Sequence, residues 1–107
     1  EFTPNPTFNY DLPIGVDYIC DNGVMIVNKC SFGGIGLGEL VREKDYKEIT
    51  LIGVCTGICV ISNAVVVRTF AGTQANVRVI GDLCACLTPE THKTALEAMK
   101  TFQVDVI

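Results

Sequence analysis

The sequence predicts an α/β fold: a mostly parallel sheet with helices on its faces, which is a three-layer α-β-α domain. Short apolar runs alternate with longer segments of helical character, in the order β-α-β-α-β-α-β. Mostly apolar runs of this length are typical of parallel strands buried on both faces. The connections between the runs are helical, as right-handed crossovers between parallel strands require.

The strands and helices are assigned in chain order. Residues 1–22 have prolines and no periodicity, so we expect a loop-like N-terminal segment. The expected strands are 24–28, 48–54, 76–81 and the closing QVDVI, 103–107. The expected helices are 37–43, 56–72 and 88–102. The segment DLCACL, 82–87, is expected to be a loop.

The last of these helices has the clearest end signals. Thr88 is a favourable N-cap, and Pro89 suits the first helical position, where its missing N–H is not needed. Gly72 fits the end of the preceding helix, and Thr56 is expected near the start of that helix.

Length and charge limit the classes of function. A chain of 107 residues forms one domain, 1–107, and 49% hydrophobic with 19% charged residues is the composition of a folded protein. The net charge is −4 and no run of Lys and Arg occurs, which argues against nucleic-acid and membrane partners. No apolar stretch is long enough to span a bilayer and no signal-peptide pattern opens the chain, so we expect a cytoplasmic protein.

Cys59 and Lys29 are the candidate catalytic residues. Cys59 lies where a strand is expected to turn into a helix, and a helix N-terminus stabilises a thiolate and offers N–H groups to an oxyanion. Lys29 follows another strand end, and parallel strands end at one edge of the sheet, so we expect it beside the segment Cys55–Cys59. The structural alternative is that Cys59 fills the core while Lys29 extends into solvent.

Most of the six cysteines are expected to be reduced, small, buried hydrophobes. Cys55 and Cys59 are spaced C-x3-C, which is not the C-x-x-C of redox and zinc modules, and no second Cys/His pair completes a metal site. No partner motif is found for Cys84 and Cys86.

Two other features are not assigned to the chemistry. The run GGIGLG, 33–38, fails the spacing G-x-G-x-x-G of dinucleotide sites and is expected to be a mobile active-site loop. His92, the only histidine, lies within an expected helix far along the chain from Cys59, so we expect a structural or surface role.

The segments VNKCSFGG, ITLIGVCTGICVISNA, VRVIGDLCACLTPETHKTALEAMK and QVDVI together resemble the isochorismatase-like cysteine hydrolases, which include nicotinamidases. The resemblance runs from about residue 24 to 107 and implies the Rossmann-like α-β-α fold of that family. Its catalytic triad is Asp, Lys and Cys, and Lys29 and Cys59 match the last two.

The resemblance also implies the surroundings of the nucleophile. The backbone N–H groups of Cys55 and Cys59 correspond to the oxyanion hole, and a cis peptide bond is implied between Val54 and Cys55. The loop at Phe32 and Gly33 corresponds to the pocket. The thiol of Cys55 is then incidental.

The sequence departs from the family pattern in two places. Thr56-Gly57 stands where the family usually has Thr-Asp, and no Asp-x-Gln, the setting of the triad aspartate, occurs anywhere. We therefore expect the C-terminal part of an incomplete isochorismatase-like domain, with an exposed apolar sheet edge and little activity alone. Its expected partners are a missing N-terminal segment or second polypeptide, and further copies in a homo-oligomer. No metal is expected in this chain, although the parent protein binds a divalent metal if it is nicotinamidase-like.

The function implied by the resemblance is hydrolysis of a small amide by a cysteine nucleophile, as in nicotinamidases. Three alternatives stay open: an isochorismatase-type hydrolase, an inactive binding or oligomerisation module of the same fold, and a redox protein that uses Cys55 and Cys59.

Overall fold

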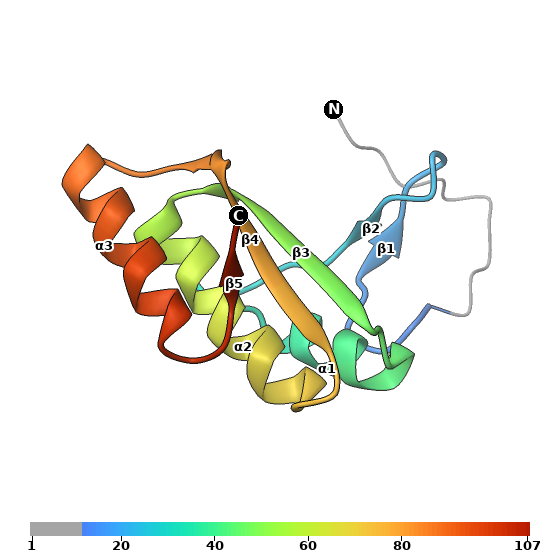
Figure 1. The fold of residues 1–107 in the computed structure, drawn as a ribbon. Helices are drawn as coiled ribbons and strands as arrows, with labels where there is room; N and C mark the ends of the chain where they lie inside the picture. The colour runs from blue at the N-terminus through green and yellow to red at the C-terminus, as the bar shows by residue number, and fades with distance from the viewer. Residues whose placement is uncertain (1–11) are drawn as a thin grey trace.

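A three-stranded parallel sheet is the larger of the two sheets in the computed structural model, which describes residues 12–107 (Figure 1). Its strands are β3 (Glu48–Val54), β4 (Asn76–Ala85) and β5 (Asp105–Val106), in the order β3-β4-β5. Both pairings are parallel. The predicted α/β class with a parallel sheet is confirmed.

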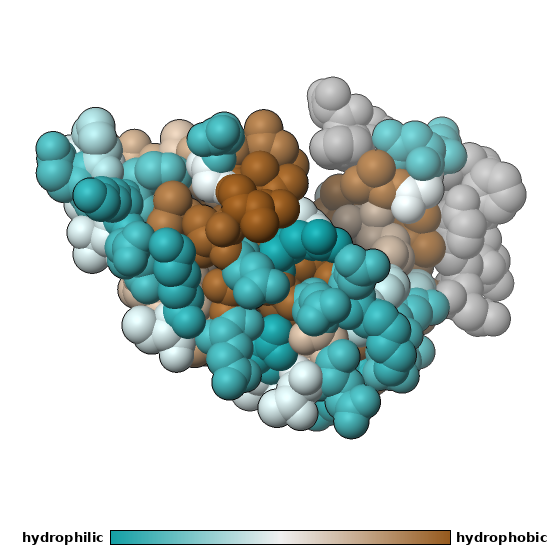
Figure 2. Space-filling view, in the orientation of Figure 1, coloured by the Kyte–Doolittle hydropathy of each residue, from teal (hydrophilic) through white to brown (hydrophobic). Residues whose placement is uncertain are grey.

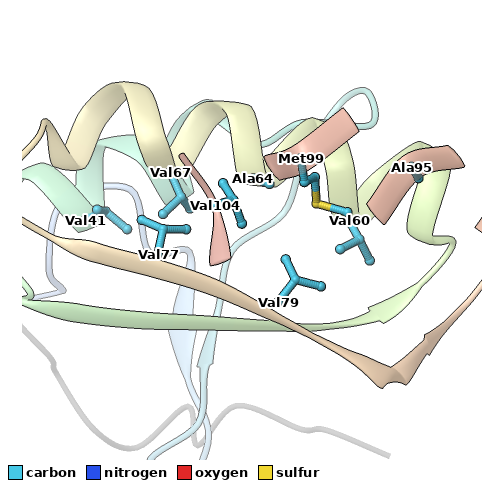
Figure 3. Close-up of a cluster of buried hydrophobic side chains, with 9 residues drawn as sticks. All are labelled: Val41, Val60, Ala64, Val67, Val77, Val79, Ala95, Met99 and Val104. Atoms are coloured by element: carbon cyan, nitrogen blue, oxygen red, sulfur yellow. The ribbon is translucent and has the colours of Figure 1, made fainter. Parts of the chain in front are cut away.

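The helices are α1 (Ile35–Lys44), the π-helical turn η1 (Thr56–Val60), α2 (Ile61–Ala71) and α3 (Pro89–Lys100). In Figure 3, side chains from α2, α3 and β4 meet between the helices and one face of the sheet. The buried core consists of Val41, Val60, Ala64, Val67, Val77, Val79, Ala95, Met99 and Val104. Burial of this many aliphatic side chains is the main favourable contribution to folding here.

The other face of the sheet exposes apolar side chains. Exposed and half-buried residues alternate along β3, and Ile52 and Val54 of the exposed set are 58% and 66% accessible. Hydrophobic surface also gathers near the C-terminus in Figure 2, where Ile107 is exposed. Within residues 12–107, β3 pairs with β4 alone, so its other edge carries no strand.

The strand expected at 24–28 is wrong in both length and place. Only β2 (Met25–Ile26) is extended, and it pairs antiparallel with β1 (Tyr18–Ile19), within the segment expected to be loop. A turn at Asn22-Gly23 joins β1 and β2. The turn is possible because Gly23 adopts a φ of 85°, which glycine tolerates and other residues rarely do. The two strands of this hairpin pair with each other and do not enter the parallel sheet. Residues 1–11 of the expected loop lie outside the described residues.

The glycine run at 33–38 is largely helical, contrary to the expected mobile loop. α1 begins at Ile35, two residues before the predicted start, and includes Gly36 and Gly38. A Cβ on Gly38 would lie 2.5 Å from the Phe70 ring of α2, and one on Gly36 would lie 2.7 Å from the Gly15 carbonyl oxygen. These glycines therefore permit close packing.

The segment 82–87 is not a loop throughout, because β4 continues to Ala85. An irregularity in the β3–β4 ladder accounts for the difference: Leu51 pairs with Val79, whereas the next paired residue, Gly53, faces Cys84. The strand thus bulges over 80–83 and then resumes pairing, which local sequence does not reveal.

The remaining expectations agree with the structure. The segment 56–72 is helical through η1 and α2 and ends at Gly72, which has a φ of 71°. Thr88 caps α3 in a capping box with Thr91, and Pro89 is the first helical residue. No helix within residues 12–107 has the length and apolar character needed to cross a membrane.

Candidate active site

Cys59 lies in η1, just beyond the carboxyl end of β3. The peptide bond between Val54 and Cys55 is cis, and Cys55 is extended. The Cys55 carbonyl accepts hydrogen bonds from the N–H groups of Ile58 (3.0 Å) and Val60 (3.1 Å). These two bonds close the turn and hold the half-buried Cys59 thiol at this end of the sheet.

Thr56 attaches the start of η1 to α3. The position of Thr56 in the sequence suggests a helix cap, but its hydroxyl makes no capping hydrogen bond. The hydroxyl oxygen instead lies 2.7 Å from Nδ1 of His92. Thr56 is fully buried, so its hydroxyl needs a hydrogen-bond partner inside the protein. The contact agrees with the structural role expected for His92.

Lys29 is brought to Cys59. Its Nζ donates hydrogen bonds to the Cys59 sulfur at 3.7 Å and to the Ser31 carbonyl oxygen at 3.0 Å. The prediction that Lys29 closes a strand of the parallel sheet is wrong. The residue follows the hairpin and approaches Cys59 from the segment between β2 and α1. A positive charge therefore lies beside the sulfur.

Asn63 of α2 joins this segment to the turn that carries Cys59. Its Nδ2 donates to the carbonyl oxygens of Cys59 (3.0 Å) and Phe32 (3.2 Å), and its Oδ1 accepts from the Gly34 N–H (2.8 Å). Sequence reasoning missed this residue. The available signal was a single amide side chain inside the apolar helical run VISNAVVV.

The segment expected to line the pocket adopts a more mixed arrangement. The Phe32 side chain is 58% exposed, whereas Gly33 lies against α2, where an added Cβ would be 3.2 Å from Val66. The segment thus packs on α2 beside Cys59 and presents an aromatic ring to solvent.

Residues 21–107 match the isochorismatase domain, which is most of the chain. The chain belongs to the isochorismatase family. The match includes Lys29, Cys59 and every element of the parallel sheet. No curated protein sequence matches the chain.

Solved structures of similar fold support this assignment of the isochorismatase domain. The pyrazinamidase of Pyrococcus horikoshii in complex with zinc is 24% identical with a TM-score of 0.63, over 77% of this chain and 46% of its own. The nicotinamidase of Staphylococcus aureus is 24% identical with a TM-score of 0.64, over 74% and 51%. An isochorismatase-like hydrolase from Alkaliphilus metalliredigens is 26% identical with a TM-score of 0.52, over 62% and 35%. The chain thus spans about half the length of the first two.

The isochorismatase domain, as far as residues 12–107 describe it, holds no group of three or more His, Cys, Asp or Glu side chains that could bind a metal ion. The residues present therefore do not fit a metal site by themselves, and no step proposed below passes through a metal.

A second cluster lies on the other side of η1. An apolar groove of about 420 Å³ runs between η1 and α3 and has Cys86 in its wall. It is lined by Gly57, Ile58, Ile61, Cys86, Leu87, Glu90, Thr91, Thr94, Ala95 and Ala98. Cys59 and Lys29 do not line it, so the isochorismatase domain presents two separate thiol environments.

Hydrogen bonds to the Cys86 sulfur hold the pKa of this thiol below its ordinary value. The Thr91 hydroxyl contributes most, followed by the N–H of Gly57; burial opposes them, and the Leu87 N–H and Cys55 thiol add smaller effects. The Thr91 oxygen also lies 2.9 Å from the Thr88 carbonyl oxygen. The Thr91 hydroxyl has one proton, so it donates to the Thr88 carbonyl oxygen or to the Cys86 sulfur at any moment. The thiolate form of Cys86 is the stronger acceptor of the two.

The cysteines differ from the expectation in their burial. All six are free, but only Cys20 is buried, Cys30 is exposed, and the other four are half-buried. The two cysteines of the C-x3-C pair have different surroundings: the Cys59 sulfur contacts Lys29, and Cys55 is among the groups that lower the pKa of Cys86.

Proposed function

We propose that the protein is a cysteine hydrolase of small amides, with Cys59 as the nucleophile. The observation that carries the proposal is the contact between the Cys59 sulfur and the Lys29 ammonium, 3.7 Å apart beyond the carboxyl end of β3. Ligands of open α/β sheets bind at that end. Two structures of similar fold are named for amide hydrolysis, a nicotinamidase and a pyrazinamidase, which supports an amide as the substrate class.

The proposed reaction has two steps. The Cys59 thiolate attacks the amide carbon, and the N–H groups of Cys55 and Cys59 and the Lys29 ammonium stabilise the negative charge that develops. The tetrahedral intermediate collapses, the carbon–nitrogen bond breaks and ammonia leaves with a proton. Water then attacks the thioester, which releases the carboxylic acid and restores the thiol.

We assign the general base to a carboxylate outside residues 12–107, the part of the chain that the structure describes. Of the acids that precede Lys29 in the described part of the chain, Asp17 already accepts a hydrogen bond from the Asn28 N–H at 2.5 Å, and Asp21 lies in the hairpin turn. The uncovered edge of β3 and the exposed Ile52 and Val54 are suited to another strand, which would deliver a carboxylate near Cys59. Free thiols throughout the chain suit a reducing, cytoplasmic location.

The test is ammonia release from nicotinamide and pyrazinamide by the complete protein, purified with every polypeptide that accompanies this chain. Cys59→Ala should lower kcat by about 10³-fold or more, and Lys29→Met by about 10²-fold, because each removes a group that acts in the transition state. Cys84→Ala, which changes a half-buried cysteine on β4, is the matched control and should retain turnover. Normal turnover by Cys59→Ala, with circular dichroism unchanged, would refute the proposal.

A binding module of the same fold is the second candidate, because Gly57 stands in place of the family's usual acid and the chain has no Asp-x-Gln. It is favoured if the complete protein contains no second polypeptide with such a strand and hydrolyses none of the amides. An isochorismatase-type activity would instead appear as turnover of a vinyl ether that depends on Cys59.

A further inference from the structure

We propose that Cys55 and Cys86 form a peroxide-reactive dithiol, a modification site that closes to a disulfide beside the candidate active site. The two residues occupy matched places in the sheet. Gly53 pairs with Cys84 and Val54 with Ala85, so Cys55 and Cys86 are the next facing pair, directly beyond the ends of β3 and β4. Neighbouring strands are about 4.8 Å apart, inside the range of about 4.4–6.8 Å that disulfides span between Cα atoms.

The side chains already meet in the reduced protein. The Cys55 side chain is near enough to the Cys86 sulfur to be among the groups that lower its pKa, and the Gly57 backbone lies so close that an added Cβ would be 3.5 Å from that sulfur. The bulge in β4 produces this alignment, because an unbroken register would place residue 83 opposite Cys55. The Cys59 thiol instead faces Lys29, whose Nζ lies 3.7 Å from its sulfur.

The surroundings of Cys86 assign it the first step. The Thr91 hydroxyl and the Gly57 N–H lower the pKa of Cys86, which favours the thiolate that reacts with peroxides, and the residue is half-buried in the wall of an open groove beside Gly57. A small oxidant has access there. Cys55, in contact with this sulfur, is the resolving thiol.

The reaction balances with hydrogen peroxide as the oxidant. The Cys86 thiolate attacks one peroxide oxygen, the oxygen–oxygen bond breaks, and sulfur keeps a hydroxyl group while hydroxide leaves and takes up a proton. The Cys55 sulfur then attacks the sulfenic sulfur, the sulfur–sulfur bond forms, and the hydroxyl leaves with the Cys55 proton as a second water. Two thiols are oxidised and one peroxide is reduced to two waters.

The test treats the reduced complete protein with one equivalent of hydrogen peroxide, blocks free thiols, and maps the peptides of this chain by mass spectrometry. We expect a loss of the mass of two hydrogen atoms, a Cys55–Cys86 linkage, and consumption of Cys86 about tenfold faster than Cys84. Cys84→Ser should form the linkage unchanged. Cys55→Ser should leave Cys86 as a sulfenic acid that dimedone traps, which keeps the proposal testable if Cys86→Ser does not fold.

A linkage of any other pair, such as Cys55 with Cys59, or equal consumption of Cys84 and Cys86 without a linkage, would overturn the proposal. The measured quantity is the Cys55–Cys86 disulfide, and its detection requires no hydrolase turnover. This inference therefore stands or fails independently of the proposed hydrolase function.

Discussion

The two parts of the molecule on either side of Gly34 are held together very differently. From α1 onward, the helices and the parallel sheet share one buried core, to which residues 12–34 contribute no side chain. The earlier part is a two-strand hairpin with its connecting segments, where Val16 and Cys20 are buried outside that core and Val24 and Met25 are exposed. Yet Lys29, one half of the candidate catalytic pair, comes from this weakly packed part.

The comparison shows that core and site are stabilised by different interactions. The position of Cys59 depends on the core through η1 and the buried Thr56, whereas Lys29 is held by polar contacts to Ser31 and by the attachment of residues 32–34 to Asn63. A single net hydrogen bond stabilises a fold by about 1 kcal/mol, far less than a filled core position. We therefore expect Lys29 to be released from Cys59 under conditions that leave the sheet folded.

The two methionines of the chain give the largest expected contrast, since one lies in each part. Met99 is fully buried and Met25 is 36% exposed. Met99→Ala should lower the free energy of unfolding by about 2–5 kcal/mol through lost contacts and a cavity. Met25→Ala should lower it by less than about 1 kcal/mol. Urea denaturation monitored by circular dichroism measures both; equal losses would show that the hairpin shares the core.

The packing of α1 on α2 gives the next largest effect. Gly38→Ala should cost about 1–3 kcal/mol, because its Cβ would lie 2.5 Å from the Phe70 ring and the helices must separate. Gly57→Ala is the control, since the contacts of its Cβ begin at 3.5 Å. We expect no loss of stability there, as alanine is the better helix former. A stable Gly38→Ala protein would mean that the α1–α2 contact adjusts freely.

The sequence predicts best the elements that have local signals. Strand 48–54 and helix 88–102 were predicted closely because an apolar run and local capping signals define them. The apolar run at 24–28 predicts a strand of the sheet, but the Asn-Gly turn next to it pairs the chain locally, so a hairpin forms there.

The same limits apply to the site. The proximity of Lys29 and Cys59 was predicted from the shared edge at which parallel strands end, and the two residues are in contact although no strand of the parallel sheet precedes Lys29. The premise was therefore wrong, and the resemblance to the family's triad implied the same pair independently. The neighbours of Cys86 are Gly57 and Thr91, and they meet only because β4 bulges before its last pairs. A register irregularity arises from three-dimensional packing and leaves no local signal.

Asn63→Ala tests the junction between the two parts directly. The substitution removes the acceptor of the Gly34 N–H and both donors that bind residues 32 and 59. We expect hydrogen exchange at Gly34 to rise about tenfold, as loss of about 1.4 kcal/mol of local stability implies, while exchange in β3 and β4 stays unchanged. Asn63→Asp retains the acceptor and should protect Gly34. Faster exchange throughout the sheet would contradict a separable N-terminal part.

The smallest effect concerns one thiol and separates the two thiol environments. The Thr91 hydroxyl favours the charged form of Cys86, so Thr91→Val should raise the pKa of Cys86 and move its pH profile of alkylation to higher pH. At a pH below that pKa, the thiolate fraction and the rate both fall. Thr91→Ser keeps the hydroxyl and should retain the original profile. Lys29→Met should also leave it unchanged, because Lys29 contacts Cys59 on the other side of η1. If Lys29→Met shifts the Cys86 profile as far as Thr91→Val does, the two thiols form one electrostatic site, and the weakly packed N-terminal part controls both.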